Sequence, residues 1–272
     1  MAYENISSRD NSLLRHARAV RDGKIEELIF VEGLRLCEEA LRSQLPIEAV
    51  IFSEELARKE KAKHLLDKLN AVSDRLAAVS ETLLASISYT KTPQGIVVLA
   101  SRPQLDEAKF KAGQPASPLL VVMHGINNPV NLGAIVRTAE AAGATGAITT
   151  VNSSDPFSPK SLRGAMGSAF RLPIWTKTNY AEVLVWCNER RIKTVCADAE
   201  GPTVYTDMDW TGSKALIVGP ESAGLTADEV AAADAAVRIP MHGEVESLNV
   251  GVAASILLYE AARQRRVKNN RL

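Results

Sequence analysis

The chain has 272 residues, of which 46% are hydrophobic and 24% are charged; this is typical of a globular protein with one large or two ordinary domains. Lys plus Arg and Asp plus Glu number 32 each, so the formal net charge is zero. The overall charge therefore does not attract the protein to nucleic acid or to an anionic membrane. Three scattered cysteines and four histidines without ligand spacing argue against a disulfide framework and a metal site.

The first hundred residues alternate between predicted helices and strands. The N-terminus is too polar for a signal peptide, and no apolar run is long enough for a membrane span, which indicates a soluble cytoplasmic protein. A helix is expected over residues 7–23, capped by Ser7, Ser8 or Asp10. The other expected elements are strands at 26–32, 47–53, 76–79 and 95–100, and helices at 34–43, 54–71 and from Ser80. This alternation predicts a small α/β domain over residues 1–100 with at least partly parallel strands.

Residues 101–118 contain three prolines and little apolar periodicity, which places a linker at residues 101–117. A second alternation fills residues 118–272. Its expected strands are 119–125, 146–150, 171–175, 193–199, 214–219 and 236–241, and its expected helices are 130–142, 158–170, 180–191, 226–233 and 249–266. Because several strands are apolar without clear alternation, we expect a parallel sheet covered on both faces.

Three strands of the second domain end in turns that combine glycine with polar side chains. The turns are residues 125–137 (GINNPVNLGAIVR), 217–226 (IVGPESAGLT) and 239–255 (IPMHGEVESLNVGVAAS). In doubly wound sheets ligands bind beyond the carboxyl ends of the strands, where glycine lets the backbone approach a ligand closely. The first turn is neither a phosphate loop nor a Gly-x-Gly-x-x-Gly dinucleotide fingerprint, so it carries other chemistry.

Together the three turns resemble the three motifs of the SpoU (TrmH-like) RNA ribose 2′-O-methyltransferases in the SPOUT superfamily. The matching residues are Asn131, Gly133, Arg137 and Thr138 in the first motif, Gly219, Glu221, Gly224 and Leu225 in the second, and Ile239–Met241, Gly243, Ser247–Val250, Ala253 and Ala254 in the third. The resemblance covers roughly residues 118–266. Residues 30–41 and 90–100 are similar to the ribosomal-protein-like RNA-binding domain that many family members carry ahead of the catalytic domain.

The resemblance implies an α/β fold in two parts. Residues 118–272 would form a SPOUT-type parallel-sheet domain with a deep trefoil knot, preceded over residues 1–100 by a smaller α/β ribosomal-protein-like RNA-binding domain. The cofactor would be S-adenosylmethionine (SAM), held by backbone groups around Gly219, Ile239, Met241 and Leu248. The resemblance also implies a homodimer in which the C-terminal helix packs across the interface and the arginine of the first motif completes the partner's site.

The residues expected to carry the reaction are Arg137, Asn131, Glu221, Ser247 and Asn249. In the family the arginine is central, as a base or as an orienting group. Because a guanidinium is effectively always protonated, we favour a fork that grips the neighbouring phosphate and the developing alkoxide. Glu221 would orient Arg137 or the ribose, and Ser247 and Asn249 would bond the target hydroxyl or the cofactor carboxylate. The structural alternatives are an ion pair of Arg137 with Glu140, a solvated Glu221, and helix caps at Asn131, Ser247 or Asn249.

The resulting hypothesis is SAM-dependent transfer of a methyl group to a ribose 2′-hydroxyl of structured RNA, with ribosomal RNA (rRNA) favoured over transfer RNA. Two alternatives remain: an antibiotic-resistance rRNA methyltransferase, and a non-catalytic RNA-binding or assembly factor with the same fold. The first helix and Glu32–Arg35 are the expected RNA grip, although basic clusters at the two chain ends also fit solvated helix faces. Neither a membrane nor a metal is expected as a partner.

Overall fold

A computed structural model of the protein describes residues 3–103, 108, 110 and 113–269. Contacts within the chain divide it into two compact units. Unit 1 comprises Met1–Gln104 together with Phe157–Arg171, and unit 2 comprises Leu105–Pro156 together with Leu172–Leu272.

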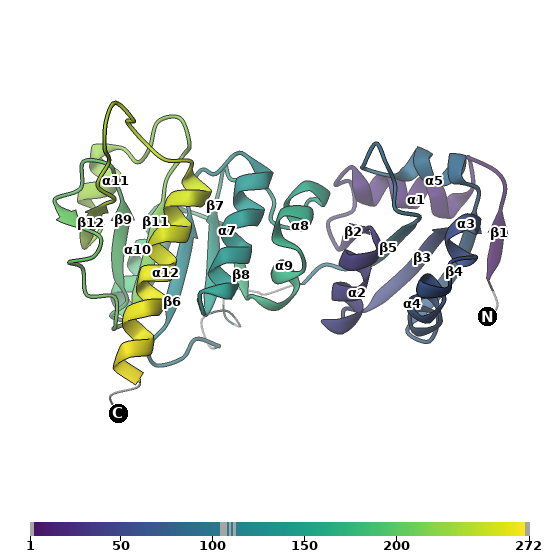
Figure 1. Ribbon diagram of the computed structural model, residues 1–272, viewed down its shortest axis with the longest axis horizontal. Coiled ribbons are helices and arrows are strands. Elements are labelled where there is room, and N and C mark those ends of the chain that lie inside the picture. The colour runs from purple at the N-terminus through teal and green to yellow at the C-terminus, as the bar shows by residue number, and fades with distance from the viewer. Residues whose placement is uncertain (1–2, 104–107, 109, 111–112, 270–272) are drawn as a thin grey trace. The chain divides into compact units, whose positions relative to one another are not determined.

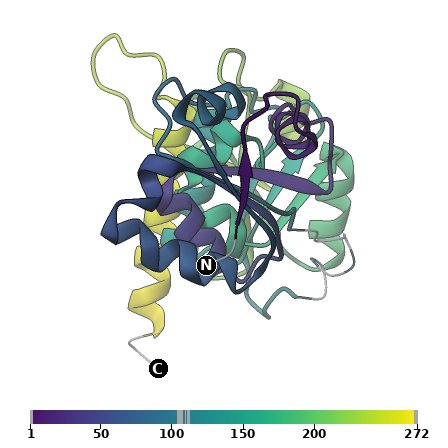
Figure 2. The same cartoon turned by 90° about the vertical axis from the view of Figure 1, so that its right-hand side faces the viewer.

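Unit 1 is built on a five-stranded mixed sheet (Figures 1 and 2). Its strands, in the order β1-β4-β3-β5-β2, are β1 (Glu4–Ile6), β4 (Ser73–Val79), β3 (Ile47–Ser53), β5 (Ile96–Ser101) and β2 (Leu28–Glu32). The pairs β1–β4 and β4–β3 are parallel, whereas β5 runs antiparallel to both β3 and β2. The prediction of partly parallel strands is therefore confirmed, and β1 is an element that the sequence analysis missed.

Helices cover both faces of this sheet. They are α1 (Ser12–Arg21), α2 (Leu34–Arg42), α3 (Glu54–Ala57), α4 (Glu60–Asn70) and α5 (Glu81–Ile87). The apolar side chains of α1 and α5 form one core with inward-facing residues of the strands, such as Ile51 and Leu99. Because successive strand residues point to opposite faces, the alternate residues of those strands face the other layer, where α2 and α4 lie.

Two local predictions for the first hundred residues are wrong. The side chain that caps α1 is that of Asn11, which accepts a hydrogen bond from the Leu13 backbone N–H. Ser8 instead accepts from the Asp10 N–H in the preceding turn. The single helix expected over residues 54–71 is instead two helices. Ser53 caps the short helix α3, which ends at Ala57, and α4 begins at Glu60.

Unit 2 contains a seven-stranded sheet in which every neighbouring pair is parallel. In sheet order its strands are β10 (Thr203–Val204), β12 (Ala235–Arg238), β9 (Lys193–Ala197), β11 (Lys214–Val218), β6 (Leu119–Met123), β7 (Gly146–Thr150) and β8 (Ile174–Thr178). The central strands β6, β7 and β11 are buried along their whole length. The prediction of a parallel sheet covered on both faces is confirmed.

The helices of unit 2 lie on both sides of this sheet. They include α7 (Pro129–Ala141), α10 (Tyr180–Glu189), α11 (Ala227–Ala231) and α12 (Val250–Asn269). Helices α7 and α12 lie side by side in front of the sheet in Figure 1, and α10 lies behind it. Val183, Trp186 and Cys187 of α10 pack against Leu120 and Val122 of β6. Within the described residues, no helix is long and apolar enough to cross a membrane.

Part of the predicted linker belongs to the core of unit 2. Phe110 is 1% exposed, and its ring centroid lies 5.9 Å from that of Trp175 and 5.8 Å from that of Trp186. Residues 104–107, 109, 111 and 112 of the same stretch lie outside the described residues. An aromatic side chain inside a Pro-rich segment therefore contributes packing that its weak periodicity does not indicate.

The segment between β7 and β8 packs in unit 1 although it lies in the second half of the sequence. It contains α8 (Pro159–Ala165) and α9 (Ser168–Arg171). Glu39 of α2 accepts hydrogen bonds from Arg171 of α9 and from Arg42. The Glu39 side chain also fills the space beside Gly167, where an added Cβ would lie 2.7 Å away, and the φ of Gly167 is +91°. A glycine is therefore required where this segment turns against α2.

Candidate functional site

A cavity of about 540 Å³ lies in unit 2 beyond the carboxyl ends of β9, β11 and β12. Its wall is formed by residues 197–199, 218–225 and 246–250, together with residues that follow β12. All four residues expected to hold the cofactor line it, namely Gly219, Ile239, Met241 and Leu248. Its position matches the rule that open parallel sheets bind ligands at the carboxyl ends of their strands.

The β11–α11 loop (residues 219–226) is folded tightly by its two glycines. A Cβ on Gly219 would lie 2.7 Å from the Leu225 side chain and 2.9 Å from the Leu225 backbone nitrogen, so the loop returns too closely for any other residue. Gly224 has a φ of +64°, and its N–H donates to the Pro220 carbonyl oxygen at 3.0 Å. Glycine is therefore needed at both positions for conformational reasons, which leaves backbone groups at the cavity wall.

A chain of side-chain hydrogen bonds joins the three motifs at the rim of the cavity. Asn249 donates from Nδ2 to Oδ1 of Asn131 at 3.2 Å, and Asn131 donates from Nδ2 to Oε1 of Glu221 at 2.8 Å. Asn249 and Glu221 both line the cavity, whereas Asn131 belongs to α7. Residues that are 90 and 118 positions apart along the chain are thus brought into direct contact.

Of the helix caps considered as structural alternatives, the one at Asn131 is wrong and the one at Asn249 is confirmed. Asn131 is not a cap, because α7 begins earlier, at Pro129, and Asn128 accepts from the Val130 N–H at 2.9 Å. Proline at the first helical position favours this start, since its φ is already helical and its missing N–H has no partner to lose. Asn249 does cap a helix: its Oδ1 accepts from the Gly251 N–H at 2.9 Å. The Asn131 amide is therefore free to join the rim contacts.

Ser247 lines the cavity, but Arg137 does not. Arg137 is exposed on α7, and among the described residues it has no hydrogen-bond or ion-pair partner, so the alternative of a pair with Glu140 is wrong. It lies seven residues after Val130, which is 46% exposed, so both side chains occupy one face of the helix. The structure thus brings four of the five expected catalytic residues together and leaves the arginine on an open face.

Two acidic residues of the cavity wall were missed in the sequence analysis. Asp198 directly follows β9, and Glu246 precedes the third motif's Ser247. The Asp198 N–H donates to the Val237 carbonyl at 3.0 Å, which fixes this residue between the ends of β9 and β12. The signal available in the sequence was position: a third strand that ends at the same edge of a parallel sheet also contributes to its ligand crevice.

The thiols offer no nucleophile for this site. Burial raises the pKa of Cys187 to about 12 and that of Cys196 to about 11, and it also raises the pKa of Cys37. All three cysteines are buried and free. A thiol with so high a pKa holds almost no thiolate at neutral pH, so the chemistry must come from other groups. In the part of the chain that the structure describes, no three His, Cys, Asp or Glu side chains converge as a metal site.

The expected RNA grip of unit 1 is partly structural. Glu32 is 5% exposed, and its carboxylate accepts from the backbone N–H groups of Tyr89 and Thr90 at 2.8 and 3.2 Å. Arg21 of α1 donates to the Ile87 carbonyl at 3.1 Å. Arg35 is exposed, so of the segment Glu32–Arg35 its guanidinium is the charge available to an external partner. At the other end of the chain, Arg265 donates to the carbonyls of Ser117 and Pro118 and is likewise committed to the fold.

Two protein-family models match the chain. The model of the SpoU rRNA methylase family matches residues 118–259, and that of an MRM3-like substrate-binding domain matches residues 14–98. The first of these ranges covers more than half of the chain and contains all three motifs and the cavity.

Relatives and solved structures are similar to the chain over most of its length. A 23S rRNA uridine 2′-O-methyltransferase of Streptomyces viridochromogenes is 30% identical, over 87% of this chain and 83% of its own. The 23S rRNA guanosine 2′-O-methyltransferase RlmB of Coxiella burnetii is 32% identical, over 79% of this chain and 87% of its own. The crystal structure of a SAM-bound rRNA methyltransferase from Sinorhizobium meliloti superimposes with a TM-score of 0.84 at 27% identity, covering 96% of this chain and 98% of that one. The chain belongs to the SpoU rRNA methylase family.

Proposed function

We propose that this protein transfers a methyl group from SAM to the ribose 2′-hydroxyl of a nucleotide in rRNA. Family membership, the names of the relatives and the SAM-bound S. meliloti structure support this activity. Because one named relative acts on a uridine and the other on a guanosine, they do not identify the base.

The observation that carries the proposal is the hydrogen-bonded chain Asn249–Asn131–Glu221 at the rim of the cavity. It joins one residue from each motif at the mouth of a hollow lined by backbone groups. A purely structural glycine turn has no need of such a convergence, whereas a site that orients two substrates does.

The cavity fits SAM in its chemistry. Val237, Ile239 and Leu257 offer apolar surface for an adenine ring, and Asp198, Glu221 and Glu246 place carboxylates around the wall. Bound there, SAM would supply an electrophilic methyl group on a positively charged sulfonium. Backbone groups of the β11–α11 loop and of Met241 and Leu248 would hold the adenosine, and the carboxylates would face its cationic part.

Arg137 would grip the phosphate beside the target ribose and stabilise the alkoxide that develops on the 2′-oxygen. Its guanidinium has no partner among the described residues and is exposed, as a group that awaits an RNA phosphate should be. Asn131, one of the rim residues, lies on the same helix. Ser247 and Asn249 would then hydrogen-bond the 2′-hydroxyl or the SAM carboxylate.

The protein would act as a homodimer through α12, so that Arg137 serves the cavity of the partner subunit. Val252 is 49% exposed and Tyr259 is 50% exposed, and seven residues separate them on one face of α12. The neighbouring helix α7 exposes Val130 and Arg137 in the same way. Two adjacent helices with exposed apolar side chains form a surface suited to burial against a second copy.

The remaining expectations extend this proposal. Residues 1–100 would bind rRNA and residues 118–272 would carry out the reaction, with a linker between them. The C-terminal part would contain the trefoil knot of the family, and the protein would work in the cytoplasm. The match of an MRM3-like substrate-binding domain to residues 14–98 supports the first assignment, and the superposition on the S. meliloti enzyme supports the second.

Calorimetric titration with SAM tests the proposal against a non-catalytic RNA-binding factor. A methyltransferase should bind SAM or its demethylated product with micromolar affinity and release heat accordingly. Absence of binding at millimolar concentrations of both would favour the binding factor and end the assignment.

A further inference from the structure

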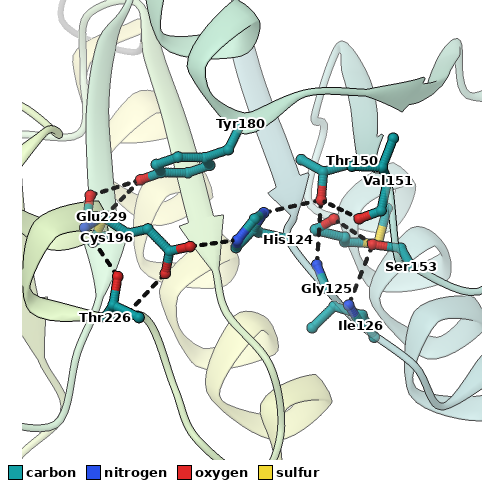
Figure 3. A network of polar contacts seen from close by, with 11 residues as sticks. His124, Gly125, Ile126, Thr150, Val151, Ser153, Tyr180, Cys196, Thr226 and Glu229 are labelled. Carbon is teal, nitrogen blue, oxygen red and sulfur yellow. Dashed lines mark hydrogen bonds and ion pairs between the residues drawn. The ribbon is translucent and has the colours of Figure 1, made fainter.

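His124 lies at the junction of two functional segments. It is the residue that follows β6, and it precedes the turn that leads into α7. Its ring is held on both sides: Nδ1 pairs with Thr150 Oγ1 and Nε2 pairs with Glu229 Oε1, each at 2.9 Å (Figure 3). The His124 side chain is 17% exposed, so these contacts lie largely out of solvent.

In the hydrogen bond between His124 and Glu229, the donor and the acceptor can be assigned. Burial alone would raise the pKa of Glu229, but hydrogen bonds from Thr226 and His124 lower it below its ordinary value, so the carboxylate is ionised at neutral pH. An ionised carboxylate only accepts hydrogen bonds. His124 Nε2 must therefore be protonated, and its N–H donates the hydrogen bond to Glu229. A charge-assisted bond of this kind is stronger than one between neutral groups.

Glu229 connects His124 to the β11–α11 loop. Its backbone N–H donates to Thr226 Oγ1 at 3.2 Å, and its carboxylate accepts from the Thr226 N–H at 2.8 Å, a capping box at the start of α11. Tyr180 reinforces the same turn: its ring centroid lies 4.6 Å from that of His124, and its hydroxyl donates to the Glu229 carbonyl at 2.8 Å (Figure 3). Burial raises the pKa of Tyr180, so this hydroxyl remains a donor.

The other end of the loop rests on the neighbour of His124. An added Cβ on Gly125 would lie 3.0 Å from the Pro220 side chain, and the φ of Gly125 is +62°. The Gly125 N–H donates to Thr150 Oγ1 at 3.3 Å, the same hydroxyl that pairs with His124. Gly125 therefore contacts the start of the β11–α11 loop at Pro220. His124 holds α11, the helix that follows the end of the loop, through Glu229.

We propose that His124 is a positioning residue of the methyl-transfer site: by bonding Glu229 while Gly125 packs on Pro220, it fixes the β11–α11 loop in the shape that receives the adenosine of SAM. This role rests on the proposed function of the cavity. His124 does not line the cavity, and within the described residues its side chain pairs with Thr150 and Glu229, so it acts through the loop. A loop fixed before binding loses less conformational freedom when the ligand arrives.

The test compares His124→Ala with a matched variant, His16→Ala. His16 forms a similar pair with Glu48 at 2.7 Å in unit 1, far along the chain from the cavity residues. We expect His124→Ala to raise the Kd for SAM about tenfold, through loss of a charge-assisted bond, and His16→Ala to leave it unchanged. His124→Gln, whose amide N–H can still donate to Glu229, should recover part of the affinity.

Hydrogen exchange separates positioning from a general loss of stability. In SAM-free His124→Ala, the amides of residues 219–226 should exchange faster while those of the buried strand β6 keep their protection. Should His124→Ala fail to fold, Glu229→Ala removes the other end of the same bond, together with the contact to the Thr226 N–H, and must raise the Kd at least as much. Equal SAM affinity and equal exchange in wild type and His124→Ala would overturn this role alone, whereas a wild type that binds no SAM would overturn the proposed function.

Discussion

Polar side chains are hydrogen-bonded to one another at the cavity wall, whereas the arginine on the exposed face of α7 is unpaired within the described residues. At the wall, Glu221 and Asn249 are tied by hydrogen bonds through Asn131, and glycines fold the β11–α11 loop tightly. On α7, Arg137 has no partner among the described residues and shares its face with an exposed valine. Glu221 and Asn249 are thus paired within one chain, whereas Arg137 is left open to a contact from outside it.

This difference suggests how the reaction is divided. A preformed wall costs little to fill with a small ligand, because its groups are already ordered. An unpaired guanidinium next to apolar surface instead suits a site that forms only when RNA and a second subunit bind there. The cofactor would thus be bound by one chain and the ribose would be positioned between two.

Arg137→Ala should have the largest effect. Loss of the guanidinium removes the stabilisation of the developing alkoxide, and the rate of methyl transfer should fall by roughly 10²–10³-fold or more. SAM affinity should stay within about tenfold, because Arg137 does not line the cavity of its own chain. Initial rates with methyl-labelled SAM, together with calorimetry, measure both quantities.

Two controls accompany that variant. Arg137→Lys keeps the charge but not the planar fork and should recover little activity. Arg190→Ala alters another exposed arginine of unit 2, one that lies over the Trp186 ring, and should transfer at the wild-type rate. An Arg137→Ala protein that remains fully active would remove the residue from the mechanism.

Co-expression distinguishes an arginine that acts in its own chain from one that serves the partner. Gly219→Leu should block the cavity, because its side chain would overlap Leu225. If Arg137 serves the partner, Arg137→Ala and Gly219→Leu subunits paired at random should recover about a quarter of wild-type activity, since half of the dimers hold one complete site. If Arg137 acts within its own chain, the mixture should stay inactive.

Tyr259→Glu should weaken the dimer, as a charge in the centre of an apolar contact is left desolvated. We expect the dimer dissociation constant to rise by about 100-fold or more, with a parallel loss of activity at low protein concentration. Light scattering after size exclusion measures the mass. Val185→Glu is the matched variant, because Val185 is 58% exposed on α10, behind the sheet, and should not change the mass. A wild type that is monomeric at high concentration would contradict this assignment.

Asn131→Ala should have an intermediate effect, because it cuts the contact between Glu221 and Asn249 without removing either. The rate of transfer should fall by about 10- to 100-fold, equivalent to one or two hydrogen bonds, with SAM affinity little changed. Asn128→Ala provides the comparison: it removes the cap of α7 and should lower the free energy of unfolding by about 1 kcal/mol, with a smaller effect on rate. Equal rates for the two variants would show that the rim contact is only structural.

The smallest expected effect concerns acid stability. Because the folded-state pKa of Glu229 lies below its ordinary value of 4.5, its ionised form stabilises the fold above that pH, and the contribution is lost as pH falls through the lower folded-state pKa. The difference in unfolding free energy between wild type and Glu229→Gln should therefore shrink from pH 7 to about pH 3. Denaturant titrations at several pH values test this, and a difference that is constant over the range would contradict it.

Much of the fold could be predicted because both halves alternate helices and strands with strong apolar runs. The runs at residues 119–123 and 214–218 are buried strands, as their composition indicates. The short strand β1, the cap at Asn11 and the place of Phe110 could not be predicted, since each depends on contacts with distant residues rather than on local pattern. The packing of residues 157–171 in unit 1 likewise involves contacts with residues far away in the chain, such as Glu39.

The site was predicted at residues that match the family motifs and missed at residues that do not. Gly219 and Leu248 were identified from their motifs, and both line the cavity. Asp198 and His124 have no motif of their own, and their positions follow only from the order of the strands and from a bond to Glu229. The open position of Arg137 was also beyond the pattern, because spacing shows that a residue lies on a helix but not what covers that helix.

The most direct test is transfer of labelled methyl from SAM to rRNA, followed by alkaline hydrolysis. A 2′-O-methyl group blocks attack of the 2′-oxygen on the adjacent phosphate, so the label should appear in alkali-resistant dinucleotides, and Arg137→Ala should yield none above background. Label that appears only in mononucleotides would indicate methylation of a base, and the absence of label under conditions where SAM binds would indicate no transfer; either result would contradict the account.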